Sequence, residues 1–187
     1  MLEEICKSVN VLTKGGIILY PTDTVWGLGC DATNPKAIER IYKIKKRVID
    51  KGLIVLVNDT EMLKEYVKDI PAIAWDLLNN IDQPTTIIYP ESKNLAKNLV
   101  SPDKSIAIRI IKDDFCNQMI TLFGKPIVST SANISGEAAP LMFSNISETI
   151  IKSVDYVVDW DQNKIKQLKP STIIKLHKNG EYEVIRK

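Results

Sequence analysis

Short apolar runs alternate along this chain with longer segments in which apolar residues recur every three or four positions. Short, bounded apolar runs are typical of buried strands, and the longer spacing is typical of amphipathic helices. Strands are therefore predicted at 16–20, 53–57, 85–89, 105–111, 126–129, 154–160 and 171–177. The Asn179-Gly180 dipeptide predicts a type I′ hairpin turn into a last strand at 181–185.

Helix predictions rest on capping residues as well as on spacing. A side chain that can accept a hydrogen bond from the first turn marks the start, and glycine often marks the end. The predicted helices and their caps are 34–46 (capped by Asn34, with Pro35 in the first turn), 60–67 (capped by Thr60), 71–80 and 113–123 (capped by Asp113 and closed by Gly124).

Several predicted strands are apolar throughout, which is typical of a sheet covered by helices on both faces. The terminal hairpin makes the expected sheet mixed rather than purely parallel. We therefore expect an α/β fold in which residues 1–187 form a single domain, a mixed β-sheet flanked by helices. Ligands of such sheets bind beyond the carboxyl ends of strands. Three such ends hold candidate functional residues: 20–24, 129–136 and the stretch after 54–57.

Composition excludes several classes of function. Hydrophobic residues make up 44% of the 187 residues and charged residues 26%, as in ordinary globular domains. No run is long enough for a membrane span, and Glu3 and Glu4 stand where a signal peptide would be positive, so a cytoplasmic protein is expected. The three cysteines form no CxxC motif, and His177 is the single histidine. A disulfide framework, a metal site and a Ser-His-Asp triad are therefore not expected.

The net charge of +2 is small, but residues 36–51 hold seven basic residues and only two acidic ones. Within this segment, Lys45-Lys46-Arg47 ends the predicted helix. Cations there complement the helix dipole. Alternatively, Lys45 and Arg47 bind an anion such as a phosphate or a carboxylate.

Two further stretches combine strand ends with polar groups. Tyr20–Gly29 reads YPTDTVWGLG, and Ser129–Gly136 reads STSANISG. Each is interpretable as a polar turn, but the density of hydroxyls in the second favours a site for phosphate or ribose oxygens. Neither is a Walker A loop or a dinucleotide fingerprint. Arg109, in an otherwise apolar strand, is either half of a salt bridge or a ligand contact.

Together these stretches resemble the YrdC-type family, the threonylcarbamoyl-adenylate synthases. Tyr20–Gly29 is similar to the family's YPT-[DE]-T-x-x-GLG opening, Lys45-Lys46-Arg47 to its KxR element, and Ser129–Gly136 to its STSAN-x-SG signature. The order also matches, and the resemblance covers nearly the whole chain, as in the short bacterial form. It implies a twisted sheet with a concave, basic cavity.

The resemblance also implies an activity. Family members convert L-threonine, bicarbonate and ATP, with Mg²⁺ on its phosphates, into threonylcarbamoyl-AMP and pyrophosphate. A separate t6A transferase complex then modifies adenosine 37 of tRNA. The residues implied are Lys45, Arg47, Ser131 and Asn133 as the functional core; Arg47, Lys51, Ser105, Ser131, Asn133 and Arg186 for ATP; Thr24, Arg109 and Ser171 for threonine; and Thr22, Ser129 and Thr130 for the shape of the cavity. Many members contact threonine through a histidine where this chain has Leu56.

Two other hypotheses remain open at this stage. The chain could be an RNA-binding module, acting on tRNA or double-stranded RNA, or a ribosome-maturation factor. Tight, salt-sensitive RNA binding without ATP turnover would support that interpretation. It could also be a paralogue with altered activity such as carbamoyl transfer. The presence of Lys45, Arg47, Ser131 and Asn133 favours an active synthase.

Overall fold

The computed structural model describes residues 1–48, 52–164 and 170–187. Its elements, in chain order, are α1 (Leu2–Thr13), β1 (Ile18–Tyr20), β2 (Gly27–Asp31), α2 (Pro35–Lys45), β3 (Ile54–Val57), α3 (Thr60–Tyr66), α4 (Ala72–Asn80), β4 (Thr85–Tyr89), β5 (Ile106–Ile110), α5 (Asp114–Phe123), β6 (Ile127–Ser131), the 3₁₀ turn η1 (Phe143–Asn145), α6 (Glu148–Ile151), β7 (Tyr156–Val157), β8 (Thr172–Leu176) and β9 (Tyr182–Arg186). No helix in these ranges is long and apolar enough to cross a membrane.

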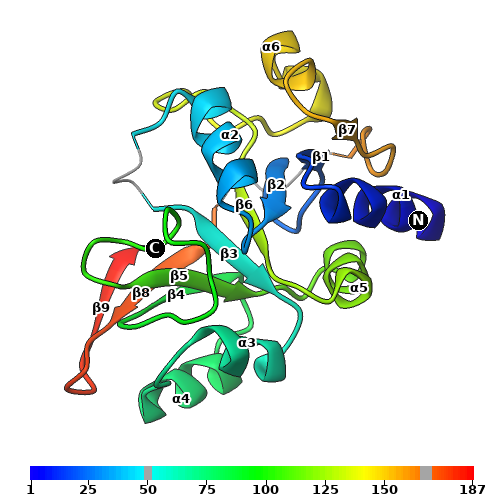
Figure 1. Cartoon of the computed structure of the whole chain (residues 1–187). Helices are drawn as coiled ribbons and strands as arrows, with labels where there is room; N and C mark the ends of the chain where they lie inside the picture. The colour runs from blue at the N-terminus through cyan, green and yellow to red at the C-terminus, as the bar shows by residue number, and fades with distance from the viewer. Residues whose placement is uncertain (49–51, 165–169) are drawn as a thin grey trace.

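The described strands form one sheet in the order β7-β1-β2-β6-β3-β5-β4-β8-β9. The pairs β1/β7, β3/β5 and β4/β8 are parallel, and the other neighbouring pairs are antiparallel. The prediction of an α/β fold with a mixed sheet flanked by helices is therefore confirmed (Figure 1). The sheet runs from β7, near α1, to β9 at the opposite edge.

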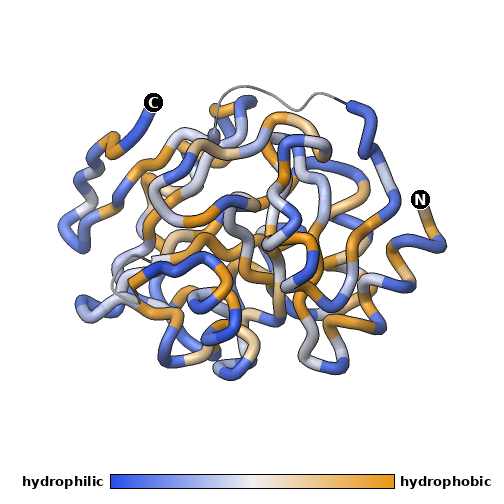
Figure 2. Tube along the Cα trace, turned by 90° about the horizontal axis from the view of Figure 1, so that it is seen from above, coloured by the Kyte–Doolittle hydropathy of each residue, from blue (hydrophilic) through white to orange (hydrophobic). Residues whose placement is uncertain are grey.

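Helices cover both faces of the sheet with separate hydrophobic clusters. On one face, Ile38 and Ile41 of α2 pack in one cluster with Val55 of β3 and Leu63 of α3. On the other face, residues of α1 and α5 pack against β1, β3 and β6. Hydrophobic stretches accordingly run through the middle of the trace, and hydrophilic stretches occupy the outer loops (Figure 2).

Four described elements were not predicted from the sequence: α1, β2 and the short η1 and α6, of which the first two matter most for the sheet. The first is α1, whose buried residues Glu4, Ile5, Ser8 and Leu12 follow helical spacing but include two polar side chains and lack a side-chain N-cap. The second is β2, whose sequence GLGCD has the glycines of a turn. Its position between β1 and β6 makes it a central strand.

Three local predictions were wrong in detail. Asp59, not Thr60, caps α3, because its Oδ1 accepts a hydrogen bond from Met62 N at 2.8 Å. The strand expected at 154–160 is reduced to the two residues of β7, which pair with the three-residue strand β1.

The turn between β8 and β9 is not type I′. Asn179 lacks the positive φ that type I′ requires, whereas Gly180 has φ +87°. Gly180 N donates to His177 O at 3.1 Å, and His177 N donates to Glu181 O at 2.9 Å. The left-handed residue is thus the last of a three-residue loop, a position that glycine takes without strain.

Candidate functional site

A cavity of about 380 Å³ opens on the sheet face that α5 covers only in part. On this face Ile54, Ala107 and Ser129 stand in register across β3, β5 and β6, and all three line the cavity. Two residues further along the strands, Leu56 and Ile127 belong instead to the hydrophobic cluster that includes Phe115 of α5. The cavity therefore begins where the helix cover ends.

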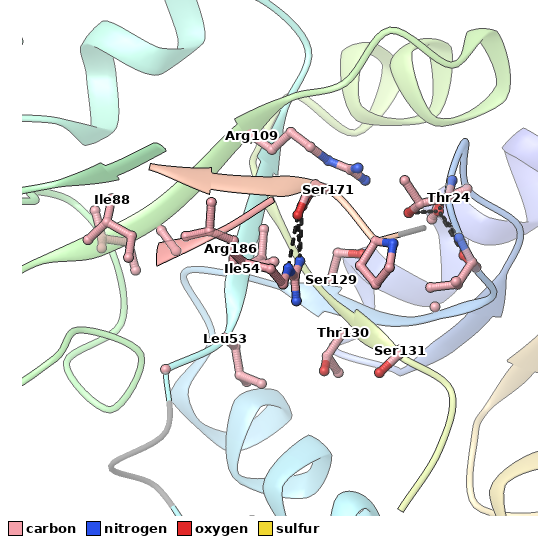
Figure 3. Close-up of a pocket in the computed structure, with 18 of the residues that line it drawn as sticks. Thr24, Leu53, Ile54, Ile88, Arg109, Ser129, Thr130, Ser131, Ser171 and Arg186 are labelled. Carbon is pink, nitrogen blue, oxygen red and sulfur yellow. Dashed lines mark hydrogen bonds between the residues drawn. The ribbon is translucent and has the colours of Figure 1, made fainter. Parts of the chain in front are cut away.

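The cavity lining combines cations, hydroxyls and aliphatic side chains. Its described cations are Arg47, Arg109, Lys175 and Arg186, and none of its described residues is acidic. Hydroxyls come from Thr22, Thr24, Ser101, Ser105, Ser129, Thr130, Ser131 and Ser171. Figure 3 shows how several of these side chains converge from different strands. Such a lining suits a ligand that is anionic, rich in oxygen and partly flat or apolar.

The turn that follows β1 is fixed by Thr22. Its Oγ1 accepts hydrogen bonds from the backbone N–H groups of Thr24 at 3.1 Å and Val25 at 3.3 Å, and donates to Val25 O at 2.7 Å. The two threonine hydroxyls lie 3.1 Å apart. Thr22 and Thr24 therefore line the cavity from a rigid turn, as the sequence motif predicted for a polar strand end.

Tyr20 supports the cavity floor from below. This fully buried side chain donates a hydrogen bond from its hydroxyl to Ser129 Oγ at 2.8 Å. Burial raises the pKa of the Tyr20 hydroxyl well above its usual value, so it remains a donor. Gly29 leaves room for the ring, because a Cβ there would lie 2.8 Å from Tyr20 Cε1. The two glycines that suggested a loop are thus explained by packing inside a strand.

Arg109 extends from β5 toward the side of the cavity where Thr24 lies (Figure 3). Arg109 is only 5% exposed. Its Nη2 lies 3.1 Å from Oδ1 of Asp23, a residue of the rigid turn after β1. Arg109 therefore forms the salt bridge that one interpretation predicted, and it also lines the cavity, where a contact with a ligand stays a prediction.

Ser171 and Arg186 close another wall. Arg186, on the exposed edge strand β9, donates to Ser171 O from Nε at 3.0 Å and from Nη2 at 2.7 Å. The Ser171 hydroxyl lies 2.8 Å from that of Thr86. Burial and the neighbouring Arg109 lower the pKa of Arg186.

Lys45 does not line the cavity. It is 1% exposed, and its Nζ donates to Ser131 O at 2.6 Å and to Asn133 O at 2.8 Å. Burial, with a contribution from Arg47, lowers its pKa to about 8. Asn133 likewise turns its amide to backbone, donating to Ile134 O and Glu137 O. These two predicted core residues thus organise the loop after β6.

The other predicted residues are placed as follows. Arg47, Ser105 and Ser131 line the cavity; Arg47 Nη2 donates to Gly52 O at 2.9 Å, and Ser105 Oγ donates to Asp103 Oδ1 at 2.6 Å. Lys51 lies outside the described residues. Leu56 is fully buried beside α5 and is absent from the described lining.

Sequence reasoning did not single out Asp23, Tyr20, Ser101 or Lys175. Asp23 was part of a quoted motif but received no role. Lys175 was assigned only to a strand, yet it lines the cavity and lies 3.7 Å from Asp103. Alternation along β8, which places Ser171, Ile173 and Lys175 on the same side, was the signal available for it.

Residues 10–187 match the Sua5_yciO_yrdC family, whose description reads "Telomere recombination". A threonylcarbamoyl-AMP synthase from Pseudoalteromonas translucida is 36% identical over 158 residues, which cover 83% of this chain and 84% of that protein. One from Xanthomonas oryzae pv. oryzae is 34% identical over 165 residues, covering 86% and 88%.

Solved structures agree with this grouping. E. coli YciO superposes with a TM-score of 0.87 at 26% identity, covering 100% of this chain and 90% of that one. P. abyssi Sua5 complexed with L-threonine gives 0.83 at 27% identity, covering 92% of this chain and 50% of that one, so this chain spans half of its length. The mixed α/β fold with a cavity on one face of its sheet defines the class, and the chain belongs to the Sua5/YciO/YrdC family. The cavity lies at the start of β3, not after residues 54–57 as the sequence predicted.

Proposed function

We propose that this protein is a threonylcarbamoyl-AMP synthase. The observation that carries the proposal is a single cavity in which cations and hydroxyls converge, in a chain whose relatives of that name align over more than four fifths of both sequences. The three substrates, L-threonine, bicarbonate and ATP, are all anions or carry an anionic group. A lining with four cations is suited to bringing them together.

The reaction needs no nucleophile from the protein. Bicarbonate takes up a proton and loses water to give CO₂. The neutral amine of threonine then adds to the carbon of CO₂ and releases a proton, which gives a carbamate. A carbamate oxygen then attacks the α-phosphorus of ATP, and the bond to the departing pyrophosphate breaks. The protein contributes proximity and stabilisation of the charge that develops on the phosphoryl oxygens.

We assign the ATP side of the cavity to Arg47, Ser105, Ser131 and Arg186, with Lys51 as a further expected contact. Lys45 and Asn133 hold the loop that presents Ser131. Magnesium would accompany ATP as the counter-ion of its phosphates, because the described lining offers hydroxyls and cations but no carboxylate ligand.

We assign the amino acid to Thr24, Arg109 and Ser171. Arg109 is suited to the carboxylate of threonine, since a guanidinium binds carboxylates with two parallel hydrogen bonds. Thr22, Ser129 and Thr130 shape the wall between the two assigned regions. P. abyssi Sua5, a relative with the same fold, has been solved with L-threonine bound, which supports an amino-acid site in this family.

The product would feed a t6A transferase complex that modifies tRNA, and the protein would act in the cytoplasm. The alternative of an RNA-binding module or ribosome-maturation factor gains no support from the relatives, whose names describe a synthase.

Pyrophosphate release tests the proposal. The purified protein is incubated with ATP, Mg²⁺, bicarbonate and L-threonine, and each substrate is omitted in turn. We expect release only when all three substrates are present, with L-serine a poorer substrate than L-threonine. Release that is independent of threonine, or no release from folded protein, would refute the synthase assignment.

A further inference from the structure

The Arg109–Asp23 pair is the most deeply buried ion pair in contact with the cavity among the described residues. The exposed fractions of the two side chains are 6% for Arg109 and 21% for Asp23. The Nε of Arg109 is also buried and has no hydrogen-bond partner within the described ranges. The ion pair between Nη2 and Asp23 Oδ1 at 3.1 Å is thus the polar side-chain contact that holds the guanidinium among the described residues.

Asp23 reaches this guanidinium from outside the cavity. Its neighbours Thr22 and Thr24 both line the cavity, whereas Asp23 is not part of the described lining. The Thr22 hydroxyl holds the turn through hydrogen bonds to Thr24 and Val25, so the carboxylate is presented from a fixed backbone. The Asp23 carboxylate can therefore orient Arg109 without occupying the part of the cavity that a ligand would fill.

We propose that Asp23 is a positioning residue that orients Arg109 to receive the carboxylate of the amino-acid substrate. The inference rests on the proposed function and adds a role for the acidic residue of the turn. A long arginine side chain loses considerable freedom when it is held in one geometry. The partly buried carboxylate pre-arranges the guanidinium and partly offsets the cost of burying its charge before the substrate arrives.

This role differs from that of an ion pair that merely stabilises the fold. The pair Arg40–Asp155 provides the comparison, because its side chains are 43% and 40% exposed and neither residue lines the cavity. Loss of that pair should not change the binding of any substrate. Loss of the Asp23 charge should weaken the binding of ligands with a carboxylate and leave the binding of ATP unchanged.

Isothermal titration of the full-length protein tests the proposal, with L-threonine, L-threoninamide and ATP as separate ligands. For Asp23→Asn we expect the Kd for L-threonine to rise at least about tenfold, and the Kd for ATP to change less than about twofold. The preference for L-threonine over L-threoninamide, which lacks the charged carboxylate, should shrink. Asp155→Asn, with the same change of charge, should bind all three ligands like the wild type.

A double-mutant cycle separates positioning from a general loss of structure. If Asp23 acts through Arg109, Asp23→Asn should cost nothing further in an Arg109→Gln background. Unchanged threonine binding in Asp23→Asn, or a parallel loss of threonine and ATP binding with a lower Tm, would overturn the proposal. If the wild type itself binds ATP but no L-threonine, the proposed function fails and the role of Asp23 fails with it.

Discussion

Lys45 combines deep burial with hydrogen bonds to two backbone oxygens. Its Nζ donates to Ser131 O and Asn133 O, and it forms no salt bridge with a carboxylate of the described residues. Burial therefore lowers the pKa of the amine to about 8 from 10.5. Through these hydrogen bonds Lys45 connects the end of α2 to the loop after β6.

The lowered pKa of Lys45 predicts a pH dependence of stability. Between about pH 8 and pH 10.5 the folded state has lost this proton while the unfolded state still holds it. The free energy of unfolding therefore increases with pH in this range. The gain has an upper bound of about 3 kcal/mol. The free energy of unfolding of the wild type and of Lys45→Met is measured in urea at both ends of this pH range. We expect the wild type to gain stability relative to Lys45→Met as the pH rises. A difference that stays constant with pH would contradict the burial of a titrating amine.

At the level of elements, the ring of Tyr20 on β1 packs closely against the glycines of β2. Tyr20 lies across Gly27 and Gly29, so that its hydroxyl reaches Ser129 on β6. A strand with any larger residue at these positions would push the ring out of the core. The glycines therefore serve close packing beneath the cavity.

Gly29→Ala should destabilise the protein by about 1–3 kcal/mol, because the added Cβ would meet Tyr20 Cε1 at 2.8 Å and Val128 O at 3.2 Å in a packed interior. Gly52→Ala is the matched control. Its Cβ would meet Ser101 Oγ at 3.6 Å, an ordinary contact, and its stability should stay close to that of the wild type. Denaturant midpoints measure both, and equal midpoints for the two variants would contradict the packing argument.

The last strand contributes to the cavity rather than to the core. All five residues of β9 are exposed, yet its Arg186 lines the cavity and holds Ser171 O. Arg186→Gln should therefore raise the KM for ATP at least about tenfold, at little cost in Tm. Lys187→Gln removes the same charge from the next residue, which lies outside the described lining, and should leave the KM unchanged. Equal effects of the two substitutions would show that general charge, not the position of Arg186, matters.

At the scale of the whole molecule, the sequence predicted the strands and helices that are determined by local patterns of residues. Continuous apolar runs such as that of β3, and the caps Asn34 and Asp113, marked elements that the structure contains. The strand β2 was missed because its glycines are explained only by the ring of Tyr20, which arrives from a different strand.

In the candidate site, too, some features could be predicted from the sequence and others depend on tertiary contacts. The resemblance to the family named seven of the eight lining hydroxyls and three of the four described cations, whereas the residue pattern alone pointed only to the strand ends after β1 and β6, to Arg47 and to Arg109. The contact of Asp23 with Arg109 joins residues far apart in the sequence, and the inward turn of the Lys45 amine depends on where the loop after β6 lies. Tertiary placement, not residue type, decides both.

Incorporation of labelled bicarbonate is the measurement that tests the central claim most directly. The protein is incubated with L-threonine, ATP, Mg²⁺ and ¹³C-bicarbonate, and the adenylate product is identified by mass spectrometry. The account predicts threonylcarbamoyl-AMP that carries one ¹³C atom, together with pyrophosphate. An adenylate without the label, or AMP and pyrophosphate alone, would contradict it.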